Sequence, residues 1–346
     1  MKKVVIAGFG FMGTMHAQIY NQLRGVRIAG IIDTHPAKAS KSMGGLGLKV
    51  PLYSTLKEAL ADAEPDIVDI CLPTHWHARF AVEALRAGRH VFCEKPLALT
   101  RNEARRIVEA AKKSGTIMQV GHCIRFWPEY QAFEAFVRSG RAGKLLSLTL
   151  QRRAGRPLYS VGDWLNDSTL SGGASLDLHV HDVDYIHHLI GRPKTVTSRG
   201  TKDYSGWSHI FTTYDFGPKG PSVTSEGGWN YPAQWGFQMA FQAVFEKGAV
   251  EFDSNANPTL TLTLDGRPRQ PLPFRVPKTG ESSTGAGNLS SLGGYFNELK
   301  SFVDCVRRGR APQVATPMQA AESLATTLTE IQSAATGKTL SVPTKL

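Results

Sequence analysis

Three glycines near the N-terminus have the type and spacing of a dinucleotide-binding turn. Gly8, Gly10 and Gly13 form the pattern GxGxxG in "IAGFGFMG", after an apolar run and before a segment of helix length. The first glycine permits a tight turn, the second lets the main chain approach a pyrophosphate, and the third allows close helix packing. Free N–H groups at the start of the helix favour the anion. A purely structural glycine turn is the alternative. The residues assigned to this pyrophosphate loop are Gly8, Phe9, Gly10, Phe11, Met12 and Gly13.

An acidic residue 20 positions after Gly13 bears on which dinucleotide binds. Asp33 ends the next apolar run, "VRIAGIID". A carboxylate there accepts hydrogen bonds from the ribose hydroxyls of NAD and repels the 2′-phosphate of NADP. The following "DTHPAK" contains no arginine for that phosphate, although His35 and Lys38 keep NADP open. We predict NAD as the cofactor, with Asp33 and Thr34 at its ribose.

Two later segments, "CLPTHWH" and "CEKP", follow the fourth and fifth apolar runs. Ligands of an open parallel sheet bind outside the carboxyl ends of its strands, so both segments should flank the cofactor. This places Lys95 in the cleft, with an ordinary solvated lysine as the alternative. The cofactor contacts predicted from these segments are Leu72, Pro73, Thr74, His77, Glu94 and Lys95.

A second polar cluster lies in "GGASLDLHVHDVDYIHHLIG", where Asp177 and His181 are four residues apart. On a helix these two side chains share one face. Histidine suits proton transfer because its ordinary pKa lies near working pH. A metal site is an alternative here, but the segment lacks HExxH-type spacing and hydride transfer to NAD needs no metal, so we predict none. The residues that would permit a metal are His179, His181, Asp182, Asp184, His187 and His188.

The elements that must position these residues change character along the chain. In the first third, short β-branched runs alternate with segments of helix length, which indicates a parallel sheet covered on both faces. Later come a glycine-broken helix near 171–190, several strands between 194 and 275, and helices at 290–308 and 316–335. The polar stretch 276–294 is expected to be a flexible loop. The fold class is therefore α/β, a doubly wound Rossmann sheet followed by a second domain.

The order of GxGxxG, "PTHWH", "EKP", "GHCIRFWP" and "GGASLDLHVHDVD" resembles the glucose-fructose oxidoreductase/inositol dehydrogenase (Gfo/Idh/MocA) family over almost the whole chain. The resemblance implies an NAD(P)-binding Rossmann domain at 1–122. It also implies an α+β domain at 123–346 for substrate binding and oligomerisation, built on a large, open, mostly antiparallel sheet. A homo-oligomer, a dimer or tetramer, follows from this resemblance, as does a cis Lys95–Pro96 bond.

The resemblance also implies catalytic roles. Lys95 would lie beside the nicotinamide and the substrate hydroxyl, where a cation stabilises developing alkoxide character. His181 would be the acid/base, Asp177 would orient substrate and imidazole, and Glu94 would contact the cofactor. The chain departs from the family pattern at His179, where glycine is frequent. This side chain either extends into the pocket or packs.

Further residues are candidates through the same resemblance. His122 is expected near the cofactor, and Arg125 at the substrate, with a structural salt bridge as the equal alternative for Arg125. Arg153 and Arg156 run from a strand into a loop, and we assign Arg153 to the substrate. Trp164 would pack against a sugar face, or else in the core.

These residues predict an NAD(P)-dependent dehydrogenase acting on CH–OH groups. Hydride passes between the nicotinamide and a hydroxyl-bearing carbon of a sugar, sugar acid, inositol or related polyol. A redox-neutral glycosidase that uses NAD transiently is one alternative. A non-catalytic dinucleotide sensor is another, and Lys95, Asp177 and His181 together argue against it.

Composition and charge narrow the classes of protein to which this chain can belong. The 346 residues are 41% hydrophobic, enough for two domains with their own cores. The net charge of +11 is spread along the chain without a nucleic-acid motif, so we expect no nucleic-acid partner, and the charge would steer an anionic cofactor. No apolar run of about 18 residues or signal peptide is evident, which predicts no membrane partner and a cytoplasmic protein. Four widely spaced cysteines indicate reduced thiols.

Overall fold

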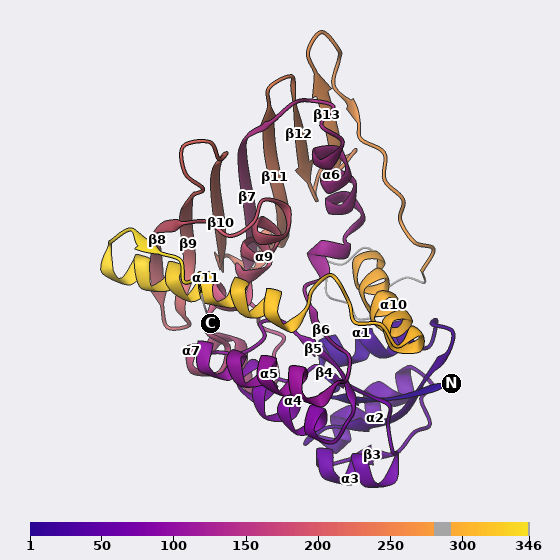
Figure 1. Ribbon diagram of the computed structural model, residues 1–346. Helices are drawn as coiled ribbons and strands as arrows, with labels where there is room; N and C mark the ends of the chain where they lie inside the picture. The colour runs from indigo at the N-terminus through magenta and orange to yellow at the C-terminus, as the bar shows by residue number, and fades with distance from the viewer. Residues whose placement is uncertain (280–291, 345–346) are drawn as a thin grey trace. The chain divides into compact units, whose positions relative to one another are not determined.

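The computed structural model describes residues 1–279 and 292–344, which form two compact units (Figure 1). Most of the loop expected at 276–294 therefore lies outside the described residues. The first unit consists of Met1–Cys123, Ser160–Trp164 and the described part of Pro277–Ala321. The second consists of Ile124–Tyr159, Leu165–Val276 and the described part of Glu322–Leu346. Residues 160–164 and the described part of 277–321, which the sequence analysis assigned to the second domain, thus belong to the first unit.

The first unit is built on six parallel strands in the order β3-β2-β1-β4-β5-β6, which confirms the doubly wound sheet. The strands are β1 (Lys2–Ala7), β2 (Val26–Ile32), β3 (Leu52–Tyr53), β4 (Ile67–Ile70), β5 (His90–Glu94) and β6 (Met118–Gly121). Its helices are α1 (Phe11–Tyr20), α2 (Pro36–Gly45), α3 (Leu56–Asp62), the short η1 (Thr74–Trp76), α4 (His77–Arg86), α5 (Arg101–Ser114) and α10 (Gly293–Arg308).

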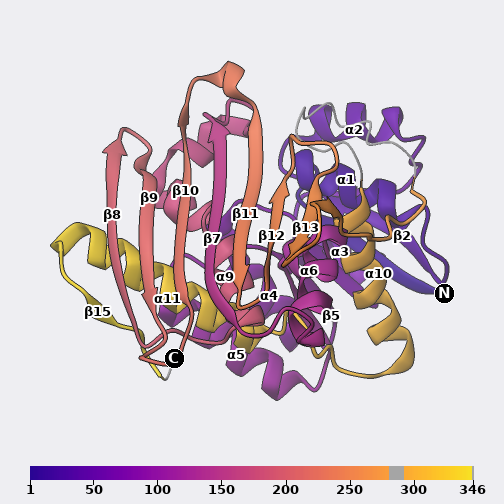
Figure 2. The same ribbon diagram turned by 90° about the horizontal axis from the view of Figure 1, so that it is seen from above.

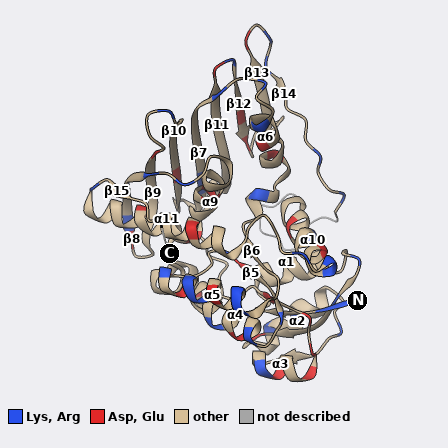
Figure 3. Cartoon of the chain, in the orientation of Figure 1, with Lys and Arg blue, Asp and Glu red and all other residues tan. Residues whose placement is uncertain are grey.

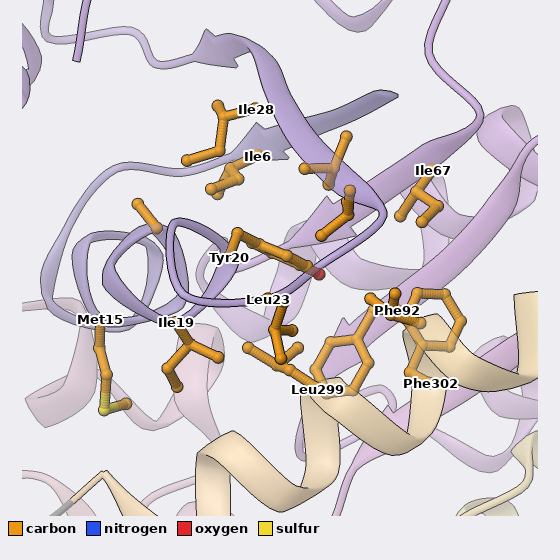
Figure 4. Packing of buried hydrophobic residues seen from close by; sticks show 14 of the residues in the cluster. Ile6, Met15, Ile19, Tyr20, Leu23, Ile28, Ile67, Phe92, Leu299 and Phe302 are labelled. Atoms are coloured by element: carbon orange, nitrogen blue, oxygen red, sulfur yellow. The ribbon is translucent and has the colours of Figure 1, made fainter. Parts of the chain in front are cut away.

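The core of this unit includes a helix from the far end of the sequence (Figure 4). Leu299 and Phe302 of α10 pack against the cluster formed by α1 and the parallel strands. The rings of Phe92 and Phe302 meet edge to face, with centroids 5.4 Å apart. The sequence predicts a helix here, but not that it completes the core of the N-terminal sheet, because its apolar positions do not name their partners.

The second unit is built on a nine-stranded sheet in the order β14-β13-β12-β11-β7-β10-β9-β8-β15 (Figure 2). Only β7 and β10 pair in parallel, so the expectation of a large, mostly antiparallel sheet is confirmed. The strands are β7 (Leu145–Gly155), β8 (Thr195–Asp203), β9 (Gly206–Asp215), β10 (Ser222–Tyr231), β11 (Phe237–Phe245), β12 (Gly248–Asp253), β13 (Leu260–Leu264), β14 (Gln270–Pro271) and β15 (Leu340–Ser341).

The helical elements after β6 are mostly short. They are η2 (Cys123–Phe126), α6 (Pro128–Ser139), η3 (Val161–Asn166), α7 (Ser168–Ser171), α8 (Ala174–Asp177), α9 (Val180–Leu189), η4 (Ala233–Trp235) and α11 (Pro317–Thr336). Helices α6, α9 and α11 cover one face of the large sheet (Figures 1 and 2). Phe133 of α6, for example, stacks on Phe241 of β11 at 4.4 Å between ring centroids.

The opposite face of the large sheet is mainly polar. Its side chains are mainly threonine, glutamine and charged residues, because outward positions alternate with the buried ones along each strand. Phe211 and Val244 are apolar residues on this face, with 50% and 45% of their surfaces exposed.

The distribution of charged residues and the state of the cysteines agree with the expectations from the sequence. Lys and Arg are spread over helices and strands of both units, with acidic residues among them (Figure 3). The four cysteines are free thiols. Among the helices that the structure describes, none combines the length and apolar character needed to cross a membrane.

Candidate active site

The glycine-rich turn between β1 and α1 has the geometry that a pyrophosphate requires. Gly8 has a φ of +88°, and a Cβ there would lie 2.6 Å from the Cys71 carbonyl oxygen. A Cβ on Gly13 would overlap the Gly8 carbonyl oxygen. A Cβ on Gly10, in contrast, meets no atom within 4 Å. Gly8 and Gly13 are thus needed by the turn itself, whereas Gly10 borders open space that a ligand can enter.

The N-terminus of α1 has two features that favour an anion. The helix has no side-chain cap and no acidic residue in its first turn, so neither a capping oxygen nor a carboxylate competes with an anion there. The side chain of Phe9 is buried, and those of Phe11 and Met12 pack partly against the core. These three residues therefore offer main-chain groups to a cofactor rather than side chains.

Asp33 is held at the end of β2 by two main-chain donors. Its Oδ2 accepts the Phe9 N–H at 2.8 Å, and its Oδ1 accepts the His35 N–H at 2.7 Å. The carboxylate is thereby fixed beside the glycine turn, in the position that the fingerprint assigns to a ribose contact. Thr34 lies next to it, and its Oγ1 is 3.2 Å from His35 Nδ1.

The carboxyl ends of neighbouring strands in the parallel sheet lie side by side and form one row of residues. Ala7 pairs with Ile70, Ile70 with Cys93, and Glu94 with Gly121. The segments that follow these strands therefore emerge side by side. They contribute Gly8, Leu72, Pro73, Thr74, Lys95 and His122 to the edge at which ligands of such sheets bind.

Lys95 follows the last residue of β5 and is half-buried at this edge. The Lys95–Pro96 peptide bond is cis, as the family resemblance implies. The Lys95 N–H donates to Glu94 Oε2 at 3.2 Å. Glu94 is itself buried, and a Cβ on Gly121 would lie 2.7 Å from Glu94 Oε1. The absence of a side chain at Gly121 therefore makes room for the Glu94 carboxylate.

His77, predicted as a cofactor contact, joins two loops. The imidazole is buried, with Nδ1 2.8 Å from the Pro96 carbonyl oxygen and Nε2 2.8 Å from that of Leu72. Burial lowers the pKa of His77, while the two carbonyls oppose this shift. A neutral ring donates to one carbonyl, and a protonated ring to both. Both ring nitrogens of His77 are therefore engaged with main chain, and its contact with the cofactor stays a prediction.

Sequence reasoning missed the buried pair His16 and Asp69. His16 Nδ1 lies 2.8 Å from Asp69 Oδ2, and His16 Nε2 lies 3.3 Å from Glu94 Oε1. Burial opposes charge on the ring, but the Asp69 carboxylate and Cys71 raise the pKa of His16 well above its ordinary value. The residues come from α1, β4 and β5, so only the assembled sheet brings them together.

His16, Asp69 and Cys71 also place donor atoms within 4.8 Å of one another, a grouping a metal ion could use. The Cys71 Sγ lies 3.2 Å from His16 Nδ1. Burial and the Asp69 carboxylate raise the pKa of the Cys71 thiol, which keeps it protonated, whereas a metal needs the thiolate. Hydrogen bonding within the cluster accounts for its arrangement.

In the second unit, Asp177 ends α8 and His181 lies in the first turn of α9, so the predicted single helix is two short ones. Both side chains are half-buried, whereas His179 between them is fully buried. Tyr159 was missed by sequence reasoning. Burial and the nearby Asp177 carboxylate raise the pKa of Tyr159 to about 12.

Arg125, predicted as a substrate contact, forms a buried ion pair instead. Its Nε and Nη2 each donate to the Asp184 carboxylate at 2.7 Å, and Ser323 Oγ donates to the same carboxylate at 2.8 Å. The residue Arg125 is 3% exposed. The salt-bridge alternative left open by the sequence therefore describes Arg125.

Neighbouring arginines on β7 point to opposite faces of the large sheet. Arg152 is buried on the helix-covered face, where it pairs with Asp182 of α9. Arg153 faces the other way and donates to Gln151 Oε1 at 2.6 Å. Asp177 and His181 belong to the helices on the covered face, so Arg153 and this pair lie on opposite faces of the sheet, and the contact of Arg153 with substrate stays a prediction. Arg156 pairs with Asp203 at 2.8 Å.

Three other candidates have simpler placements. His179 packs: its Nε2 lies 3.0 Å from Glu330 Oε2, and both side chains are fully buried. His122 is buried directly after β6. Trp164 is partly buried, and its contact with substrate stays a prediction.

The chain matches two family models along most of its length. Residues 2–122 match the oxidoreductase family with an NAD-binding Rossmann fold, and residues 130–251 match the GFO/IDH/MocA C-terminal domain. Inositol 2-dehydrogenase of Corynebacterium glutamicum strain R is 34% identical over 89% of this chain and 86% of its own. Inositol 2-dehydrogenase of Rhizobium meliloti is 27% identical over 88% of both.

A solved structure supports the fold. Levoglucosan dehydrogenase in complex with NADH and levoglucosan superposes with a TM-score of 0.83 over 99% of both chains, at 21% identity. Together with the glycine turn, Asp33 and the carboxyl edge of the parallel sheet, these matches establish that the chain belongs to the Gfo/Idh/MocA family of NAD-binding oxidoreductases.

Proposed function

We propose that the protein oxidises a hydroxyl-bearing carbon of a sugar, sugar acid, inositol or related polyol and passes the hydride to NAD. The observation that carries this proposal is Lys95 at the carboxyl edge of the sheet, in the row that contains the glycine turn. A cation at this edge can stabilise the substrate oxygen as a carbonyl forms. Relatives named inositol 2-dehydrogenase support a polyol among the substrates.

The roles of individual residues belong to the same proposal. The first unit binds NAD, and the second unit supplies the substrate-binding groups. His181 accepts the hydroxyl proton, Asp177 orients the imidazole and the substrate, and Lys95 stabilises the same oxygen. Trp164 packs against the substrate ring. His122 and Glu94 lie on the cofactor side.

The two alternative functions have less support. A redox-neutral glycosidase would share the fold, yet the relatives compared above are named as dehydrogenases. A sensor without catalysis would need neither Lys95 nor the Asp177–His181 pair.

A substrate panel tests the proposal. Inositols, hexoses, pentoses, uronates and anhydrosugars are incubated with NAD or NADP, and reduced nicotinamide is followed by absorbance. We expect net reduction of NAD with at least one cyclic polyol or sugar. Glycoside cleavage without NADH accumulation would support the glycosidase, and NAD binding without either reaction would support the sensor.

We also propose that the protein forms a homo-oligomer through the exposed face of the large sheet. Phe211 and Val244 lie there, half-exposed, among polar side chains. Light scattering at micromolar concentration should detect a dimer or tetramer, and Phe211→Glu should shift it toward monomer. A wild-type protein that is monomeric throughout would contradict this assignment.

A further inference from the structure

Lys95 stands between two residues that are each tied to a buried histidine. Glu94 before it lies 3.3 Å from His16 Nε2, and the Pro96 carbonyl oxygen after it lies 2.8 Å from His77 Nδ1. The two histidines come from different helices, α1 and α4. They therefore hold the turn that carries Lys95 from two sides.

On one side, His77 fixes the turn to the neighbouring loop. Its second ring nitrogen lies 2.8 Å from the Leu72 carbonyl oxygen, in the segment that follows β4. The ring thus spans the two loops that leave β4 and β5. Loss of the imidazole would release the Pro96 carbonyl, which belongs to the residue after Lys95.

On the other side, the His16 ring lies at ion-pair distance from the Glu94 carboxylate, with 3.3 Å between Nε2 and Oε1 but without the geometry of a hydrogen bond. Its Nδ1 is anchored 2.8 Å from Asp69 Oδ2, and Asp69 is fully buried on β4. Glu94 Oε2 in turn accepts the Lys95 N–H at 3.2 Å. A continuous set of contacts therefore runs from Asp69 through His16 and Glu94 to the main chain of Lys95.

Neither histidine is placed to touch a substrate. The exposed fractions of His16 and His77 are 0% and 1%. Their polar atoms face protein groups, and any effect they have on the reaction must pass through the turn.

We propose that His16 and His77 are positioning residues that fix the turn around Lys95 and thereby place its ammonium group for catalysis; this rests on the function proposed above. A lysine side chain is flexible, so a mobile main chain would add further disorder at the reacting oxygen. A displacement of about 1 Å in such a group can lower the rate by roughly 10².

A double-mutant cycle in the full-length enzyme tests this proposal. His77→Leu and His16→Gln are made alone and in a Lys95→Ala background, and kcat is measured on the substrate found in the panel. In the wild-type background each variant should lower kcat by about tenfold or more, while NADH affinity, measured by fluorescence, changes by less than about threefold. In the Lys95→Ala background the same changes should alter kcat by less than about twofold, because no ammonium remains to be placed.

His90→Leu serves as the matched control. His90 lies at the opposite end of β5, is half-buried, and accepts the Ile117 N–H through Nδ1 at 3.0 Å. It resembles His77 in bonding a main-chain group, but it is remote from the carboxyl edge. This variant should leave kcat within about twofold of the wild type in both backgrounds.

The outcomes separate the two proposals. Equal losses of kcat in both backgrounds would assign the histidines a merely structural role and overturn the inference, while leaving the proposed function intact. Wild-type turnover by Lys95→Ala would overturn the role of Lys95 and the positioning role with it. If His77→Leu does not fold, His77→Gln, which retains a donor for one carbonyl, takes its place in the cycle.

Discussion

Arg152 and Asp182 form a two-bonded ion pair in the interior of the second unit. Arg152 Nε donates to Asp182 Oδ2 at 2.9 Å, and Nη2 donates to Oδ1 at 2.8 Å. The residues are 1% and 0% exposed. The pair joins β7 to the helix that carries His181, one residue before Asp182.

Removing one partner of this pair should destabilise the protein strongly. Asp182→Asn leaves the buried guanidinium without a compensating charge, which typically costs about 3–5 kcal/mol. The double variant Arg152→Met with Asp182→Leu removes both charges and should recover most of that loss. Denaturant unfolding measures the free energy of each variant.

The exposed pair of Arg269 and Glu251 is the control for this prediction. Both side chains are largely accessible, so Glu251→Gln should change the free energy of unfolding by less than about 1 kcal/mol. A loss for Asp182→Asn as small as that of the control would show that the buried pair contributes little.

The glycine turn allows binding to be separated from folding. Gly10→Ala places a methyl group where no protein atom lies within 4 Å, so the free energy of unfolding should change by less than about 1 kcal/mol. NAD affinity should fall by at least about tenfold, because the methyl occupies the approach to the pyrophosphate. Calorimetric titration and thermal unfolding provide the two measurements.

Gly13→Ala is the contrasting variant. Its Cβ would overlap the Gly8 carbonyl oxygen, so it should destabilise the protein even without NAD. If the Gly10→Ala variant binds NAD as tightly as the wild type, the prediction that the pyrophosphate binds at this turn is wrong.

Asp33 should determine the preference for NAD. Asp33→Ala removes the carboxylate that we predict to contact the ribose and to repel a 2′-phosphate, so NAD should bind about tenfold more weakly. Binding of NADP should be unchanged or stronger. Titrations with both cofactors measure the ratio of affinities. Strong preference of the wild type for NADP would defeat the assignment, and Asp62→Ala, a change at an exposed acid of the same unit, is the control.

The sequence predicted the parallel sheet because each buried strand is a short apolar run followed by a helical segment. It also predicted the glycine turn and the positions of Asp33 and Lys95, since these residues lie within a few positions of a strand end. Local pattern was sufficient for both. The same cannot be said of α10, whose contacts with β5 join residues about 200 positions apart.

Arginine and histidine roles were harder to predict. Arg125 and Arg153 each look suitable for a polar substrate, but their partners lie on other elements or on one particular sheet face. Adjacent residues of β7 point to opposite faces of the sheet. A shift of one position therefore decides whether an arginine side chain pairs with Asp182 or lies on the exposed face. His77 was predicted as a cofactor contact because neighbouring residues in the sequence are predicted contacts. Its contacts with the carbonyl oxygens of Pro96 and Leu72 are visible only in the folded structure.

Lys95 and His181 should behave as one catalytic unit. Lys95→Ala and His181→Ala should each lower kcat by about 10² or more, with much smaller effects on NAD affinity. The double variant should be scarcely slower than the poorer single variant, because residues acting on one oxygen are not additive. Steady-state kinetics on the panel substrate provides the measurement.

The pH profile of kcat/KM adds an independent check on His181. For oxidation, the low-pH limb should disappear in His181→Ala if it reports deprotonation of the imidazole. Turnover near the wild-type value in either single variant would remove that residue from the proposed mechanism.

His16 should make the stability of the protein depend on pH. Its folded-state pKa is raised well above 6.5 by Asp69 and Cys71 despite burial, so the folded protein holds this proton more tightly than the unfolded chain. The stabilisation is complete below pH 6.5 and is lost as pH rises toward the folded-state pKa. Across that window one proton contributes a decline in the free energy of unfolding of up to about 1.4 kcal/mol per pH unit. Denaturant unfolding at a series of pH values measures the slope.

Asp69→Asn removes the principal charge that raises the pKa of His16, so the slope of this variant above pH 6.5 should be shallower than that of the wild type. Identical slopes for the two proteins would show that the imidazole of His16 does not carry the proton in the folded state.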